Sequence, residues 1–143
     1  RDYYPFLGDN DAWARKYSIE LGYVDNRSIP RILALADILI QPGRPDRFNN
    51  YRFPSKLPEF FSIGRPIVLP ATNVGLFTTH LQHAYVLPVA DALHMAASIR
   101  HIRSDPQLAQ QLAQGAIDFA AQHLSWQRNA EKLQQFYLAP REC

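Results

Sequence analysis

The chain has 143 residues, of which 47% are apolar and 20% charged. This composition is typical of a globular protein and excludes a disordered tail. No apolar run approaches the ~20 residues that a membrane span needs. A count of 15 Lys and Arg against 13 Asp and Glu gives a net charge of +2, too small a bias to indicate a nucleic-acid partner. The single cysteine, Cys143, excludes a disulfide framework and a Cys-based metal site, and we expect a reducing, cytoplasmic compartment.

The N-terminal third predicts short elements. Residue 1 is Arg rather than Met and residues 3–8 read as the end of a strand, so we expect the chain to be a piece of a longer protein. Residues 21–24 predict a short strand, and the apolar spacing of residues 29–36 predicts a helix. Residues 38–40 are a continuous branched run, typical of a buried strand in a parallel sheet.

Residues 42–54 break this pattern, because their prolines, glycine and asparagines predict a loop. Pro54 and Ser55 then suit a helix start, residues 56–63 continue the helix, and Gly64 fits the position just after it. Residues 67–69 and 84–87 predict two more strands, with a turn at residues 73–75 between them.

The C-terminal third predicts three helices. In the first, the residues that share one face are Ala92, Leu93, Ala96 and Ile99. Asp105 and Pro106 cap and open the second, whose apolar stripe is Leu108, Leu112, Ala116 and Phe119. The third begins near Ser125, and we expect its stripe to pack in the core: Trp126, Ala130, Leu133 and Tyr137. Strands alternating with helices predict an α/β fold, a Rossmann-like parallel sheet flanked by helices.

The loop after residues 38–40 is a candidate ligand site, because open parallel sheets bind ligands outside the carboxyl ends of their strands. Between Gln41 and Lys56 only one carboxylate, Asp46, stands among four cations. These cations are Arg44, Arg47, Arg52 and Lys56. Together with the N–H groups of the following helix they predict an anion site for a diphosphate. A solvated basic loop explains the charge equally well.

Glu59 lies one turn into the same predicted helix, three residues after Lys56, so both side chains can face one side. A carboxylate there can accept hydrogen bonds from a ribose diol. A surface Lys–Glu pair worth a few tenths of a kcal/mol is the alternative, and the residues alone leave both open.

Residues 53–68 resemble the nucleotide-sugar motif of retaining glycosyltransferases of family 4: a Glu, four residues, a Gly, a variable residue, then Pro-Val. Glu59, Gly64 and residues 66–68 fit that spacing. Three further stretches agree in order, at residues 21–24, 35–42 and 124–126, so the resemblance covers roughly residues 20 to 137.

The resemblance implies the C-terminal half of a GT-B glycosyltransferase. Residues 1–143 would be a single nucleotide-sugar-binding domain that lacks the first strand–helix unit and the N-terminal acceptor domain, so the isolated domain would be inactive. The implied reaction moves a hexose from a nucleotide-diphosphate-sugar to an acceptor hydroxyl with retention, in glycan biosynthesis, with no metal or other cofactor. The implied partners are the donor and the N-terminal domain of the same chain, without nucleic acid; peripheral membrane contact through the missing half stays open.

The resemblance also implies roles for single residues. Glu59 would bind the ribose hydroxyls, and Tyr23 and Val24 would lie near the base. The turn from residue 53 to 56 would approach the phosphates through Pro54 and Ser55, with Arg52 and Lys56 as the cations. Tyr51 stands where the family often carries a second Glu near the donor sugar, which leaves the sugar contacts unassigned.

Several alternatives remain open. A GT-B-like sugar-nucleotide epimerase would share the donor site, whereas a non-catalytic GT-B domain with a degenerate site would act in protein interaction. Residues 9–11 match a short Asp-x-Asp metal signature, although a helix-capping turn is the commoner use of such residues. His80 and His83 have a spacing that can bind zinc on a helix, but no carboxylate or Cys accompanies them.

Overall fold

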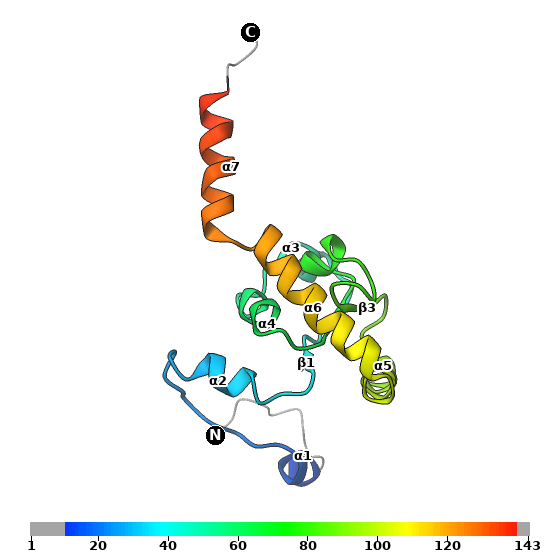
Figure 1. Ribbon diagram of the computed structural model, residues 1–143. Coiled ribbons are helices and arrows are strands. Elements are labelled where there is room, and N and C mark those ends of the chain that lie inside the picture. The colour runs from blue at the N-terminus through cyan, green and yellow to red at the C-terminus, as the bar shows by residue number, and fades with distance from the viewer. Residues whose placement is uncertain (1–10, 140–143) are drawn as a thin grey trace.

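The computed structural model describes residues 11–139; the strand end expected at residues 3–8, the first two residues of the Asp-x-Asp motif and Cys143 lie outside them. Three parallel strands form one sheet in the order β1 (Leu39–Ile40), β2 (Ile67–Pro70), β3 (Tyr85–Leu87). Leu39 lies opposite Ile67, and Val68 lies opposite Tyr85. The predicted α/β fold with a parallel sheet flanked by helices is therefore confirmed (Figure 1).

The central strand β2 shows why helices are needed on both faces, because all four of its residues are buried. Ile67 and Leu69 pack against one cluster, built from α4 (Leu57–Ile63) and the C-terminal half of α6 (Pro106–His123). Val68 points to the opposite cluster, built from α5 (Ala92–Ser104) and the N-terminal half of α6. Alternate side chains of a strand point to opposite faces, so a fully apolar strand needs cover on both.

Helix α4 begins and ends where the sequence predicts. Pro58 stands in its first turn, and Leu57, Phe60 and Phe61 are its buried residues. Gly64 closes the helix with φ 71° and ψ 43°, a left-handed conformation that favours glycine. A Cβ on Gly64 would lie 2.7 Å from the Ile117 side chain of α6, so this close approach also needs the missing side chain.

The strand predicted at residues 21–24 is wrong. These residues lie in an irregular segment between α1 (Asp11–Tyr17) and α2 (Ile29–Leu33), with a left-handed Gly22 (φ 66°) and a bend at Tyr23, which is fully exposed. None of them pairs with the sheet, and a segment whose backbone groups lack a neighbouring strand is not held as a strand. The helix predicted at residues 29–36 is shorter, ending at Leu33, where turns to Leu35 and Ala36 lead into β1.

Two segments expected as loop or turn contain short helices. In the loop predicted at residues 42–54, α3 (Arg47–Tyr51) forms because the Asp46 carboxylate accepts the Asn49 N–H at 2.7 Å and so caps its start. After β2, η2 (Asn73–Phe77) is a 3₁₀ helix rather than a plain turn. The helix considered for His80 and His83 does not form; both lie in a turn that joins η2 to β3.

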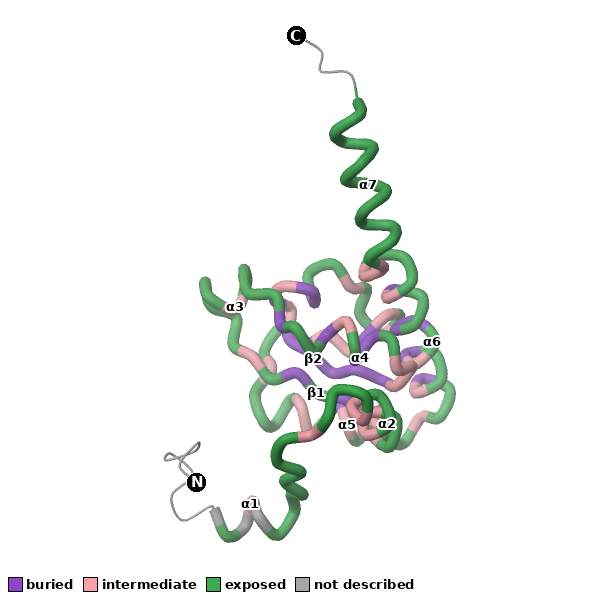
Figure 2. The backbone as a smooth tube through the Cα atoms, turned by 90° about the vertical axis from the view of Figure 1, so that its left-hand side faces the viewer, coloured by how far each residue is buried: buried purple, intermediate pink, exposed green. Residues whose placement is uncertain are grey.

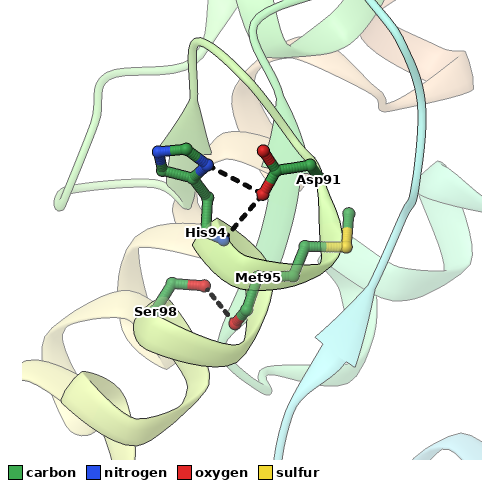
Figure 3. A network of polar contacts seen from close by, with 4 residues as sticks. All are labelled: Asp91, His94, Met95 and Ser98. Atoms are coloured by element: carbon green, nitrogen blue, oxygen red, sulfur yellow. Dashed lines mark hydrogen bonds and ion pairs between the residues drawn. The ribbon is translucent and has the colours of Figure 1, made fainter.

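Helix α5 starts at a well-formed cap (Figure 3): Asp91 Oδ1 accepts the His94 N–H at 2.9 Å and lies 2.8 Å from His94 Nδ1. The N–H bond comes first in holding the pKa of the Asp91 carboxyl below its ordinary value. The apolar face predicted from residues 92 to 99 is not the buried one, since Leu93 is 80% exposed while Ser98 and Ile102 are buried. Ser98 tolerates burial because its hydroxyl donates to the Met95 carbonyl at 2.8 Å.

Helix α6 follows the prediction closely. Asp105 caps it by accepting two backbone N–H groups at 3.0 Å each, Pro106 is its first residue, and the predicted apolar stripe is buried. None of the helices in the described range is both long and apolar enough to cross a membrane.

Helix α7 (Trp126–Leu138) is the largest departure from the sequence-based expectation. It begins at the predicted place, where Ser125 accepts the Arg128 N–H. None of its residues is buried, and Trp126 is 90% exposed. Figures 1 and 2 show α7 projecting from the body of the molecule, entirely exposed along its length. The predicted packing of its stripe in the core is wrong, because Leu124 and the extended Ser125 turn the chain outward.

Candidate functional site

The segments that leave β1 and β2 meet at the carboxyl edge of the sheet. After β1 the chain runs through residues 41–46 into α3, and after β2 it runs into η2. Asn73, the first residue of η2, joins the two: its Nδ2 donates to the Asn49 carbonyl of α3 at 3.0 Å, and its Oδ1 accepts the Val74 N–H at 2.6 Å. This edge is where parallel sheets bind ligands.

The cations of this edge are exposed, and two of them lie over aromatic rings. The Arg52 guanidinium carbon lies 5.5 Å from the centroid of the Phe48 ring, and Lys56 Nζ lies 5.8 Å from the Phe60 ring. Such cation–π contacts orient a side chain without neutralising its charge.

The single carboxylate of the loop, Asp46, caps a helix. Asp46 caps α3, and the hydrogen bond from the Asn49 N–H comes first in holding the pKa of Asp46 below its ordinary value. Asp46 keeps its charge and interacts with Arg44, so the loop has four cations against one carboxylate.

Glu59 lies in the first turn of α4 and is exposed. Within the described part of the chain its carboxylate has no ion pair, so the surface Lys–Glu pair considered from the sequence does not form; the Lys56 ammonium lies over Phe60 instead. Its oxygens are thus available to hydroxyl donors from a ligand.

The start of α4 offers fewer N–H donors than the sequence suggests. The Leu57 N–H donates to the Pro54 carbonyl at 3.0 Å, and Pro58 has no N–H. In this first turn the N–H of Glu59 is left without an acceptor among residues 11–139. An anion here is therefore held mainly by the side-chain cations.

The predicted site residues between Tyr51 and Glu59, which are close in the sequence, lie together at this edge of the sheet. Tyr51 ends α3 and is exposed, Arg52 follows it, buried Pro54 anchors the turn through its carbonyl, and exposed Ser55 and Lys56 lead into α4. Tyr23 and Val24 are not part of this group, since they belong to the irregular segment before α2.

A pocket of about 480 Å³ opens beside this group. Its walls come from the end of α3 and the residues after it, from η2 and from the C-terminal end of α6, and they are mostly apolar. The lining includes Tyr51 and Arg52, which the sequence suggested. Other lining residues, Phe77, Phe119 and His123, were missed, because aromatic or histidine side chains in helical patterns look like core or structural residues until three distant segments are brought together.

His80 and His83 serve the turn before β3. His83 Nδ1 accepts the Thr79 N–H at 3.1 Å, and His80 Nδ1 accepts the Val86 N–H at 3.1 Å. Burial against Phe119, 5.3 Å between ring centroids, lowers the pKa of His83, and nearby His123 lowers it further. No cluster of three or more His, Cys, Asp or Glu side chains that could hold a metal occurs in the described range.

A family model described as glycosyl transferase-like matches residues 4–135 of the chain. TuaH of Bacillus subtilis (strain 168), a proposed teichuronic acid biosynthesis glycosyltransferase, is 34% identical over 73 residues, which are 51% of this chain and 18% of TuaH.

Two solved structures share the fold. The C-terminal domain of a glycosyl transferase group 1 family protein (LpcC) from Francisella tularensis matches with a TM-score of 0.61 and 15% identity, over 74% of this chain and 53% of that one. HepE of Anabaena, solved in complex with UDP-glucose, matches with a TM-score of 0.71 and 17% identity, over 94% of this chain and 38% of HepE. The chain thus spans a fraction of the length of each relative, and its fold is that of GT-B C-terminal domains.

Proposed function

Because this chain belongs to the glycosyl transferase-like family, we propose that it supplies the donor site of a family 4 glycosyltransferase, which moves a sugar from a nucleotide-diphosphate-sugar to an acceptor hydroxyl with retention. The observation that carries the proposal is the group at the carboxyl edge: exposed Glu59 without an ion pair among the described residues, one turn after Lys56 and close in sequence to Arg52. The likeness to HepE, whose structure contains UDP-glucose, supports a nucleotide-sugar donor.

Each residue of the group has a proposed role. The Glu59 carboxylate accepts hydrogen bonds from the ribose diol, as acidic residues do in dinucleotide folds. Arg52 and Lys56 hold the diphosphate, and the Ser55 hydroxyl and the Glu59 N–H add neutral donors. Tyr51 faces the donor sugar. The base contact proposed for Tyr23 and Val24 comes from outside this group, from the segment before α2.

The catalytic contribution of this half is stabilisation of the leaving group. As the glycosidic bond breaks, negative charge develops on the nucleoside diphosphate, and fixed cations stabilise that charge more than they stabilise the bound donor. The side chains supply the positive charge themselves, so the proposal invokes no metal.

The rest of the enzyme lies beyond this chain in the proposal. An N-terminal GT-B domain of the same protein would bind the acceptor, and the whole protein would act in glycan biosynthesis in the cytoplasm.

Calorimetric titration of the chain with UDP, GDP and ADP tests the donor site. We expect saturable binding of one nucleotide, with UDP the first candidate, and about tenfold weaker binding by Glu59→Ala, since one hydrogen bond to a charged group is worth ~1.5 kcal/mol or more. Glu131→Ala on exposed α7 is the matched control and should bind as the unchanged chain does.

Two results would contradict the proposal. If no nucleotide binds, the site is degenerate and an interaction domain becomes the better description. If Glu59→Ala binds the nucleotide as tightly as the unchanged chain does, the nucleotide binds at another site.

A further inference from the structure

The turn at residues 79–84, which joins η2 to β3, has a strained backbone. Leu81 has φ 61°, in the left-handed region that favours glycine. Within the turn, the Leu81 N–H donates to the Ala84 carbonyl at 2.9 Å, and the His83 N–H donates to the Thr79 carbonyl at 3.0 Å. A segment strained in this way keeps its conformation only while its surroundings hold it.

Two histidine rings hold this turn through Nδ1. His83 Nδ1 accepts the Thr79 N–H at 3.1 Å across the turn, and His80 Nδ1 accepts the Val86 N–H at 3.1 Å, which ties the turn to β3. A histidine Nδ1 accepts a hydrogen bond only while it carries no proton, so both rings are neutral here, with their proton on Nε2. When a ring takes a second proton, Nδ1 becomes a donor that faces another donor, and the bond is lost.

The ring of His83 faces α6, which contributes Asp118, Phe119 and His123. Burial lowers the pKa of His83, His123 lowers it further, and Asp118 raises it. The Phe119 ring contacts both imidazoles, with centroids 5.3 Å from His83 and 4.8 Å from His123. Once both imidazoles are charged, their repulsion adds to the loss of the Thr79 bond, and Asp118 offsets only part of it.

The ring of His80 faces β3 and, beyond it, α5. It meets the Tyr85 ring edge-on, with centroids 5.0 Å apart, and the Tyr85 hydroxyl lies 3.3 Å from His101 Nδ1. Neither His80 nor His101 has an ion pair with a carboxylate among residues 11–139. A second proton on His80 therefore breaks the Val86 bond without forming a new ion pair in its place.

We propose that His80 and His83 make the turn at residues 79–84 a pH-sensitive latch, closed while both rings are neutral and open when they are protonated, with the sheet and the helices still folded. One bond does not titrate: Gln111 Nε2 donates to the Leu81 carbonyl at 2.8 Å and keeps the open turn tethered to α6. Gln82 and His83 form the wall of a second pocket, of about 330 Å³, whose other lining residues belong to α6. Opening the latch removes that wall and changes the surface that the chain presents beside α6.

Nuclear magnetic resonance of the ¹⁵N-labelled chain between about pH 7 and about pH 5 tests the latch. Imidazole ¹⁵N shifts report which ring nitrogen carries the proton, and backbone order parameters report the mobility of the turn. At the higher pH we expect protons on Nε2 alone. At the lower pH we expect the order parameters of residues 79–84 to fall from about 0.85 to below about 0.6. The amides of β2 should keep their values, because that strand has no titratable side chain.

Two double variants separate the hydrogen bonds from the titration. In His80→Asn with His83→Asn, each amide oxygen takes the place of Nδ1 as an acceptor but does not titrate, so the turn should stay ordered at both pH values. In His80→Ala with His83→Ala the acceptors are gone, and the turn should be mobile at both. His94→Gln is the control, because His94 lies beside Asp91 at the start of α5, and it should respond to pH as the unchanged chain does. Circular dichroism checks that all variants fold.

Any of five results would overturn the inference. The first two concern the rings: a proton on Nδ1 of His80 or His83 at about pH 7, or rings still neutral at about pH 5. The next two concern the turn: order that persists at the lower pH although both rings are charged, or a pH response that persists in the asparagine variant. The last is a loss of order in β2 together with the turn, which would mean that the whole chain unfolds. None of these measurements depends on the donor site.

Discussion

Replacing Gly115 by Ala should destabilise the protein, although the same change in an ordinary helix stabilises it. Gly115 is buried in the middle of α6, against the turn that carries Gln82 and His83. A Cβ there would lie 1.8 Å from the Gln82 carbonyl oxygen and 3.3 Å from the His83 Cα, where ordinary contact begins at 3.4 Å. These neighbours are backbone atoms, so no side-chain rotation relieves the overlap and the turn must move away from the helix.

Two opposing energies set the size of the effect. Alanine gains about 1 kcal/mol over glycine in a helix interior, and overpacking a well-filled contact costs ~1–3 kcal/mol. Because the overlap is with backbone, we expect the upper end of that cost and a net loss of about 2 kcal/mol. For a chain of this length that corresponds to a fall in Tm of roughly 7 °C.

Urea unfolding followed by circular dichroism measures this difference directly. Gln110→Ala, at an exposed position of the same helix, is the control and should change the free energy of unfolding by no more than about 0.5 kcal/mol. If Gly115→Ala instead stabilises the chain by the ordinary helix increment, α6 and the turn at Gln82 are not in contact.

Three further predictions concern stability. Asp105→Ala removes the acceptor of two N–H groups at the start of α6 and should cost ~1 kcal/mol in urea unfolding; an unchanged midpoint would show that the cap is not formed. Burial lowers the pKa of His83 below 6.5, so the unfolded chain binds more protons, and stability should fall as the pH drops from 6.5 through the folded-state pKa. His83→Gln should flatten that part of the pH profile, and an equally steep profile would contradict the assignment. Phe61→Ala, in the fully buried core, should cost ~3–5 kcal/mol, whereas Leu133→Ala on α7 should stay within about 0.5 kcal/mol; a large loss at Leu133 would mean that α7 packs on the body.

The parts of the fold that the sequence predicts well are those governed by local rules. Gly64 ends α4 because the left-handed conformation at that position favours glycine. Helix α6 starts at Asp105 and Pro106 because the Asp105 carboxylate accepts backbone N–H groups and the proline ring is compatible with the first helical turn. Their helices also have one clear apolar face each.

The predictions that fail concern features that depend on contacts between residues far apart in the sequence. The stripe of α7 predicts an amphipathic helix, but periodicity does not say what covers the stripe, and Trp126 is exposed. Residues 21–24 have strand composition, yet no neighbouring strand pairs with them in the described range. Leu93 belongs to an apparent apolar face, but the packing of α5 buries Ser98 and Ile102 instead.

The same distinction applies to the candidate site. The group from Tyr51 to Glu59 is continuous in the sequence, so the sequence alone shows its motif and its charge. The apolar pocket is built from segments separated by more than 60 residues, from Arg52 to His123, and no linear pattern connects them.

We propose above all that the carboxyl edge from residue 51 to 59 binds the diphosphate and ribose of a nucleotide donor. Amide chemical-shift mapping of the ¹⁵N-labelled chain during titration with UDP tests it residue by residue. We expect the largest changes on the amides of Arg52, Ser55, Lys56 and Glu59, with the Glu59 N–H shifted most strongly as it gains an acceptor. Saturable changes confined to the turn at residues 79–84 or to α5, with the amides of residues 51–59 unmoved, would contradict it.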